Sequence, residues 1–172
     1  FFYLLFLAVL SAALTWVVIP TLPARAQTPV ACTTADLISA ISGATAGATL
    51  DLAAGCTYTL TAVDNTTGGA NGLPVINVAL TINGNGAIIT RSAGAPDFRI
   101  FYVGATGNLT LENVTISYGR AVGAAGANGQ GGGIFNAGAL TLHNSTVTNN
   151  AAIGGNGGQG TAGSTGSPGG SG

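Results

Sequence analysis

NLTLENVTISYG, residues 108–119, belongs to a pattern that runs through most of the chain. A leucine near the start of each copy stands at 50, 80, 109 and 140, which gives intervals of 30, 29 and 31 residues. A second apolar residue follows each leucine by two positions, with one further residue between them. The second apolar residues are Leu52, Ile82, Leu111 and Leu142, and the intervening residues are Asp51, Thr81, Thr110 and Thr141.

Alternation with a period of two is typical of a β-strand that has one face buried. The pattern continues after a kink into VTIS (114–117) and TVTN (146–149), and further short strands fit FRIFYV (98–103) and GIFN (133–136). A unit of about 30 residues does not bury its apolar column alone, so like strands must stack in parallel, about 4.8 Å apart. The sequence predicts an all-β parallel β-helix, or solenoid. A β-sandwich is the alternative, and the regular spacing of the leucines favours the solenoid.

Three segments carry a resemblance to a known class: GLPVINVALTINGNGAIITRS (72–92), FRIFYVGATGNLTLENVTISYG (98–119) and GGGIFNAGALTLHNSTVTNNAA (131–152). They resemble the exported right-handed parallel β-helix repeat proteins of bacteria. GGGIFN is similar to the GGAI-type repeats of polymorphic outer-membrane autotransporter proteins. The resemblance covers about residues 31–152 and implies a right-handed solenoid at a bacterial surface. It implies little about activity, because such scaffolds include adhesins, autotransporter passenger domains and surface proteins of other roles.

The N-terminal segment has the features of an export signal. Residues 1–19 carry no charge, and Pro20, Pro23 and the small-x-small tripeptide Ala24-Arg25-Ala26 follow. We expect residues 1–26 to be a signal-peptide helix without its initiator Met and basic start, cleaved after Ala26. A retained membrane anchor is the alternative. Export would place the protein at the cell surface, in the outer membrane or outside the cell.

The two cysteines, Cys32 and Cys56, fall in the segment that follows. In an exported chain such a pair is most simply a disulfide, and two cysteines with one distant His143 make an incomplete metal-ligand set. We expect a capping segment at 27–48 with a short helix that Thr34 caps and Gly43 ends. The apolar face of this helix would consist of Leu37, Ile38 and Ile41.

Two glycine-rich stretches, 121–133 and 154–172, interrupt the pattern at matching places. We expect them to be flexible loops on one side of rungs that span residues 49–153. A new rung follows the first stretch, whereas the second ends at Gly172, so we expect the natural chain to continue beyond this point. Neither stretch predicts a cofactor. GNGGQG lacks the strand–helix context of a dinucleotide-binding loop, and it lacks the Asp of calcium-binding glycine repeats.

The charge composition excludes a class of partners. The chain has five acidic residues, four Arg and no Lys, and its formal net charge is −1. Nucleic-acid binding depends on a positive field that this composition lacks.

Catalytic β-helices that cleave sugars need two carboxylates close together. Counted from the preceding repeat leucine, Asp51, Asp64, Asp97 and Glu112 each have a different offset, so no carboxylate pair is expected. Glu112 and His143 do share an offset, and adjacent rungs would bring them within hydrogen-bonding range. They form either an acid–base pair or a surface pair at a strand end. We expect the surface pair, because no third ionisable residue is in register.

Outward threonines form a second candidate site. Thr81, Thr110 and Thr141, with Thr115 and Thr146 beside them, resemble the hydroxyl arrays of ice-binding solenoids. Thr is also a good strand former that tolerates solvent. The second interpretation is favoured, because the unequal repeat intervals and long loops would disturb a flat array.

Together these features predict a non-catalytic exported scaffold, the adhesion or surface-display part of a larger protein. Its partners would be host-cell, matrix or glycan surfaces, and membrane contact would come only through the signal segment or a C-terminal anchor beyond the chain. The alternative function is the N-terminal part of a polysaccharide lyase or glycoside hydrolase, with its active site in further rungs.

Overall fold

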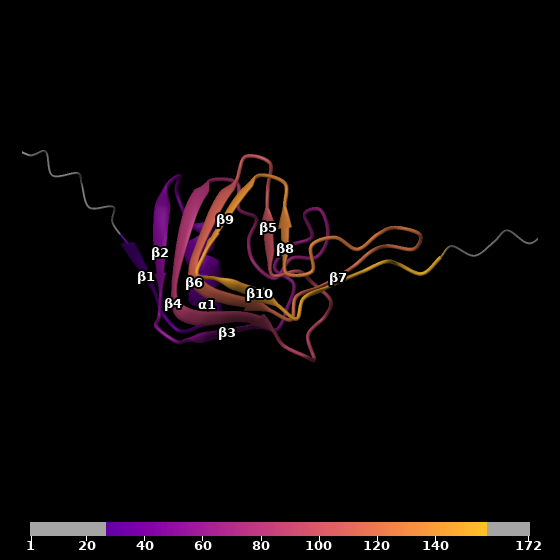
Figure 1. Ribbon diagram of the computed structural model, residues 1–172, viewed down its shortest axis with the longest axis horizontal. Helices are drawn as coiled ribbons and strands as arrows, with labels where there is room; N and C mark the ends of the chain where they lie inside the picture. Colours follow the sequence, from indigo (N-terminus) through magenta and orange to yellow (C-terminus); the bar gives the residue numbers. More distant parts are fainter. Residues whose placement is uncertain (1–26, 158–172) are drawn as a thin grey trace, which may run out of the picture.

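The computed structural model describes residues 27–157, which form a parallel β-solenoid of about three turns with one short helix (Figure 1). The expected signal segment, with Ala24 and Ala26, lies outside the described residues. So does the C-terminal glycine-rich stretch beyond residue 157.

The main sheet joins successive turns of the chain in the order β1, β2, β4, β6, and β6 then pairs with both β9 and β10. Strands β4 and β6 are long and bend, so that each contributes to two sides of the solenoid (Figure 1). Their first halves lie with β2 and β9 on what we call the first face, and their second halves with β3 and β10 on the second face. The strands are β1 (Gln27–Val30), β2 (Ala48–Leu52), β3 (Thr57–Leu60), β4 (Ala79–Arg91), β6 (Asn108–Ser117), β9 (Ala139–His143) and β10 (Thr146–Thr148).

Two smaller sheets of two strands each lie outside the main sheet. They pair β5 (Phe101–Val103) with β8 (Ile134–Asn136) and β7 (Arg120–Val122) with β11 (Ala151–Ile153). All pairs of named strands in the described chain are parallel, which confirms the solenoid and excludes the antiparallel β-sandwich.

The register of the first turn differs from the prediction. Leu80, Leu109 and Leu140 align as expected, but Leu50 pairs with Ile82 and not with Leu80, so the first interval is 32 residues, from 50 to 82. A slip of two residues keeps every apolar side chain inside and every polar one outside. Period-two alternation therefore does not distinguish the two registers.

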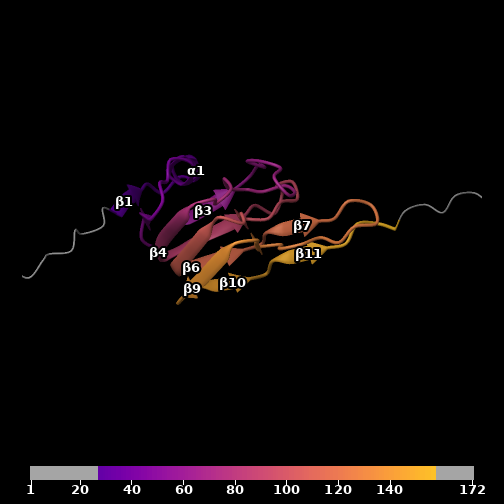
Figure 2. The ribbon, with the colours of Figure 1, turned by 90° about the horizontal axis from the view of Figure 1, so that it is seen from above.

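Inward side chains from both faces form one continuous core. Leu50, Ile82 and Leu111 from the first face and Tyr58 and Ile116 from the second are almost completely buried. At the end of the stack formed by β9 and β10 (Figure 2), the equivalent Leu142 and Val147 are each 43% exposed.

Helix α1 (Thr34–Ser42) lies at the opposite end, beside β1 and β3 (Figure 2). Leu37 and Ile41 are buried and Ile38 packs against the core, as the apolar pattern predicts. The N-cap is Thr33, whose hydroxyl accepts a hydrogen bond from the Asp36 amide (3.1 Å). The prediction of Thr34 as the cap is wrong by one residue, because the Thr34 hydroxyl instead donates to the Thr59 carbonyl (3.0 Å) of β3.

The capping segment also contains a strand that the sequence did not reveal. Strand β1 pairs in parallel with β2, although Pro29 lies within it. Proline has no amide hydrogen and is tolerated here because β1 is an edge strand.

The described parts of the two glycine-rich stretches lie against each other. Backbone hydrogen bonds join Gly123 to Ile153 (2.9 Å), Gly126 to Asn156 (2.8 Å) and Gly155 to Ala127 (2.8 Å). A Cβ atom on Gly129 would lie only 2.2 Å from the Ile153 carbonyl oxygen. Glycine here permits close backbone packing in addition to any flexibility.

Candidate functional site

One outward column of the first face contains three of the ionisable residues that the sequence singled out, Asp51, Glu112 and His143. The register aligns Asp51, Asn83, Glu112 and His143 on four successive strands. The expectation that no two carboxylates share an offset is therefore wrong, because the two-residue slip moves Asp51 into the column of Glu112. With a rung spacing of about 4.8 Å, their backbone positions are about 10 Å apart.

Asp51 is held by amide side chains from the next turn. Its Oδ1 accepts hydrogen bonds from Asn83 Nδ2 (2.8 Å) and Asn85 Nδ2 (2.9 Å), and the Asn85 amide also donates to the Leu52 carbonyl (2.9 Å). Asn85 lies at the bend of β4 with φ 51°, a left-handed conformation that Asn adopts more readily than most residues. These contacts give Asp51 a structural role, fixing the corner between the two faces.

Glu112 and His143 lie on neighbouring strands, as the sequence predicts. Glu112 is half-buried and His143 is exposed. Within residues 27–157 no ion pair or side-chain hydrogen bond joins them, and the ion pair that the described chain does contain is Arg120 with Asp97 (2.6 Å). The structure thus brings the two residues side by side without connecting them chemically.

The threonine column is more regular than the sequence suggested. Thr49, Thr81, Thr110 and Thr141 are aligned on β2, β4, β6 and β9. The repeats differ in length, but the additional residues lie in the segments that connect the strands. The paired strands therefore keep the threonines aligned. A shallow hollow of about 160 Å³ lies beside it, lined by Gly47, Ala79, Leu80, Thr81, Asn108 and Thr110.

The second face also has outward hydroxyl groups, but it is less uniform. One column consists of Thr59, Thr90, Ser117 and Thr148, of which Ser117 is buried, and the other of Thr57, Ile88, Thr115 and Thr146. The exposed Ile88 interrupts the second column. The first face is therefore the more uniform polar surface.

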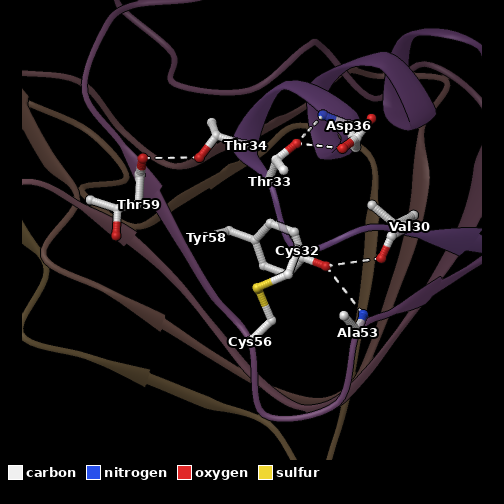
Figure 3. Close-up of a disulfide and its surroundings, with 9 residues drawn as sticks. All are labelled: Val30, Cys32, Thr33, Thr34, Asp36, Ala53, Cys56, Tyr58 and Thr59. Carbon is white, nitrogen blue, oxygen red and sulfur yellow. Dashed lines mark hydrogen bonds between the residues drawn. A yellow bond between two sulfur atoms is a disulfide. The ribbon is translucent and has the colours of Figure 1, made fainter.

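The predicted disulfide between Cys32 and Cys56 is present and ties the segment before α1 to the start of β3 (Figure 3). Beside it, the Tyr58 hydroxyl donates to the Val30 carbonyl (3.2 Å) and accepts from the Ala53 amide (3.2 Å). Burial raises the pKa of Tyr58; the hydrogen bond from Ala53 opposes this shift and the charge of Asp36 adds to it. The arrangement stabilises the capped end of the stack.

A cavity of about 270 Å³ lies next to α1, lined by Thr34, Ile38, Leu60, Thr61, Ala62, Val63, Asp64 and Gly72. Its lining contains a single ionisable side chain, Asp64, whose carboxylate accepts a hydrogen bond from the Asn65 side-chain amide (2.9 Å). In the part of the chain that the structure describes, no three His, Cys, Asp or Glu residues are grouped to hold a metal ion. The same part contains no helix long and apolar enough to cross a membrane.

One buried polar cluster, formed by Asn71 and Arg99, lies outside the predictions made from the sequence. Asn71 is 0% exposed and Arg99 is 5% exposed, and both have buried polar atoms without hydrogen-bond partners. The sequence offers one indication of this cluster, an arginine inside the otherwise apolar strand sequence FRIFYV. Because arginine side chains are mostly exposed, the sequence alone would place this one on the outer surface.

No protein-family model, curated protein or solved structure matches the chain.

Proposed function

We propose that the chain is a non-catalytic exported scaffold, the adhesion or surface-display part of a larger protein, and that its first face is the contact surface. The observation that carries this proposal is the column of Thr49, Thr81, Thr110 and Thr141 with the hollow beside it. Each hydroxyl both donates and accepts hydrogen bonds, and the column repeats at the rung spacing of about 4.8 Å. Such a surface suits a partner that is itself repetitive and rich in hydroxyl groups.

The charges favour a neutral glycan as that partner. A polyanion needs free cationic groups, whereas Arg120 is paired with Asp97 and the Arg91 guanidinium donates to the carbonyls of Tyr118 (2.9 Å) and Ala95 (2.8 Å). Host-cell or matrix surfaces that carry glycans belong to the same class of partner.

Two further observations support export. The Cys32–Cys56 disulfide is consistent with an oxidising or extracellular location. The resemblance to exported bacterial right-handed β-helix proteins and to outer-membrane passenger repeats points to the cell surface. N-terminal sequencing of secreted protein tests the signal segment, with Gln27 expected as the first residue. Recovery of an intact apolar segment in the membrane would replace secretion with anchoring.

The contact surface is tested by binding of the purified chain to immobilised neutral glycans, glycosylated matrix proteins and host cells. Thr81→Val with Thr110→Val removes two first-face hydroxyls and keeps the β-branched shape that strands favour. We expect this variant to lose about tenfold or more in affinity. The matched control, Thr59→Val with Thr90→Val on the second face, should bind as the parent does. Absence of binding to every surface, or equal losses in both variants, would overturn the proposal.

One observation favours the enzyme alternative. Asp51 and Glu112 share a column, and their backbone positions, about 10 Å apart, lie just beyond the roughly 6.5 to 9.5 Å that separates the two carboxyl groups of an inverting glycosidase. The engagement of Asp51 by two asparagines weighs against a catalytic role. We expect no release of reducing ends or unsaturated products from pectins, alginates or glycosaminoglycans. Turnover that disappears in Glu112→Gln would establish the enzyme instead.

A further inference from the structure

The end of the stack opposite α1, which we call the open end, leaves strand edges without partners. The last strands of the main sheet here, β9 and β10, each pair with β6 and with no other strand of the described chain (Figure 2). The backbone amides and carbonyls on their other side therefore have no strand to bond to. An edge of this kind is a template for pairing with a further strand.

The core is exposed at the same end. Leu142 continues the inward column of Ile82 and Leu111, which are both 0% exposed, but Leu142 itself is 43% exposed. Val147 continues the column of the fully buried Ile116 and is also 43% exposed. These two side chains occupy core positions with no turn above them. Apolar surface at the open end thus lies directly beside the unpaired strand edge.

The open end has no charged side chain. Every Asp, Glu and Arg of the chain precedes residue 121, and His143 is the single ionisable side chain after it. Natural proteins protect exposed edges with charges or proline, and β9 and β10 contain neither. The opposite end is protected, because Pro29 lies in the edge strand β1 and α1 covers the core. Two copies can therefore meet at their open ends without bringing like charges together.

Residues 158–172 do not offer a cover for the open end. They consist of Gly, Ser, Thr and Gln with one Ala and one Pro, so they contain no large apolar side chain to pack on Leu142 and Val147.

A second copy of the chain does offer such a cover, because β9 alternates symmetrically about Thr141. Antiparallel pairing of two β9 strands centred on Thr141 places Leu140 opposite Leu142 of the second copy, and each Thr141 opposite its counterpart. Opposite residues of an antiparallel pair point to the same face. The leucines of both copies therefore stay inside and the threonines stay outside.

We propose that two copies of this chain associate head to head through their open ends, with a two-fold axis at Thr141. The contact uses the same surface on both copies and closes at a dimer, because the α1 end of each copy is protected. It joins the two first-face threonine columns into one surface of twice the length, on which a repetitive partner is bound by both copies at once. The association itself does not depend on what the first face binds.

Analytical ultracentrifugation of the purified chain tests the assembly. Because the interface is small, we expect monomers at about 1 µM and dimers at about 100 µM. Val147→Lys places a charge at the exposed core and should weaken association about tenfold or more. Thr146→Lys is the matched control, because it adds the same charge on the outward side of the same strand, and it should dimerise as the parent does.

Three results would overturn the proposal. They are a monomer at every concentration, a series of larger oligomers, and equal association of the two lysine variants. A monomer in which the amides of β9 and β10 resist hydrogen exchange would show that residues 158–172 cover the open end instead.

Cysteine substitution locates the two-fold axis. Opposite residues of an antiparallel pair have Cα atoms about 4.5 to 5.5 Å apart, which is within the range of a disulfide. Thr141→Cys should therefore give covalent dimers on mild oxidation. Thr59→Cys, exposed on β3 far from the open end, should stay monomeric under the same conditions. Equal yields from both variants, or no cross-link in Thr141→Cys at a concentration where the parent is dimeric, would contradict pairing at β9.

Discussion

Tyr58 places a hydroxyl group inside the stack, where its side chain is only 1% exposed and both of its hydrogen bonds go to the backbone (Figure 3). Tyr58→Phe keeps the ring and removes this oxygen, which leaves the Val30 carbonyl and the Ala53 amide without their partner. We expect the free energy of unfolding to fall by about 1 to 2 kcal/mol. Denaturant titration measures it, and an unchanged midpoint would show that water replaces the hydroxyl.

Because of Tyr58, we also expect the free energy of unfolding to depend on alkaline pH. The pKa of Tyr58 is raised in the folded chain because burial disfavours the phenolate, whereas in the unfolded chain it ionises near pH 10. The folded state therefore holds the proton more tightly, and the associated stability is fully present below pH 10 and is lost as the pH rises through the folded pKa. Denaturant titrations between pH 8 and 11.5 should show a steeper loss in the parent than in Tyr58→Phe. Parallel curves would contradict the assignment.

Asp51 and Arg99 show why sequence alone did not give the candidate sites. The sequence placed Asp51 on the outer surface correctly but assigned it to the wrong column, because alternation specifies the face of a strand and leaves a shift of two residues open. The burial of Arg99 depends on contacts with Gly68, Tyr102 and Phe135 from three different turns. No local pattern reports such contacts. The pairing of Glu112 with His143 was predictable because their two leucines align without a slip.

At the scale of the elements, the end of the stack that α1 covers depends on the Cys32–Cys56 disulfide. Cys32 and Cys56 are 24 residues apart in sequence and enclose α1 and β2. Replacing both by serine should lower the free energy of unfolding by about 3 kcal/mol in the chain-entropy model. If the double variant loses its helical signal before its β signal on heating, the destabilisation lies at α1. Equal stability of the parent and the double variant would contradict a structural role.

The elements themselves were predictable to different degrees. The helix followed from the spacing of Leu37 and Ile41 and from Gly43, and the long strands from their alternation. Strand β1 was missed because Pro29 and its short length argue against a strand when pairing partners are unknown. The contacts between the glycine-rich stretches were missed because glycine specifies neither a face nor a period.

At the scale of the whole molecule, three structural features occupy different parts of the solenoid. One end is closed by α1 and the disulfide, the two faces carry outward hydroxyl columns, and the segments outside these faces contain the buried Arg99 and the glycine-rich stretches. Parallel stacking is what turns single threonines into a column, since strand pairing places equivalent residues of successive turns side by side. The proposed contact surface is thus a property of the stack and not of any one turn.

The first-face surface depends most directly on the pairing of Thr49 with Thr81. Cross-strand nuclear Overhauser effects in the isotope-labelled chain measure this register in solution. The expected contacts join Thr49 to Thr81, Leu50 to Ile82 and Asp51 to Asn83. Contacts that instead join Leu50 to Leu80 and Asp51 to Thr81 would break the threonine column at its first member, return Asp51 to a separate column from Glu112, and contradict the proposed surface.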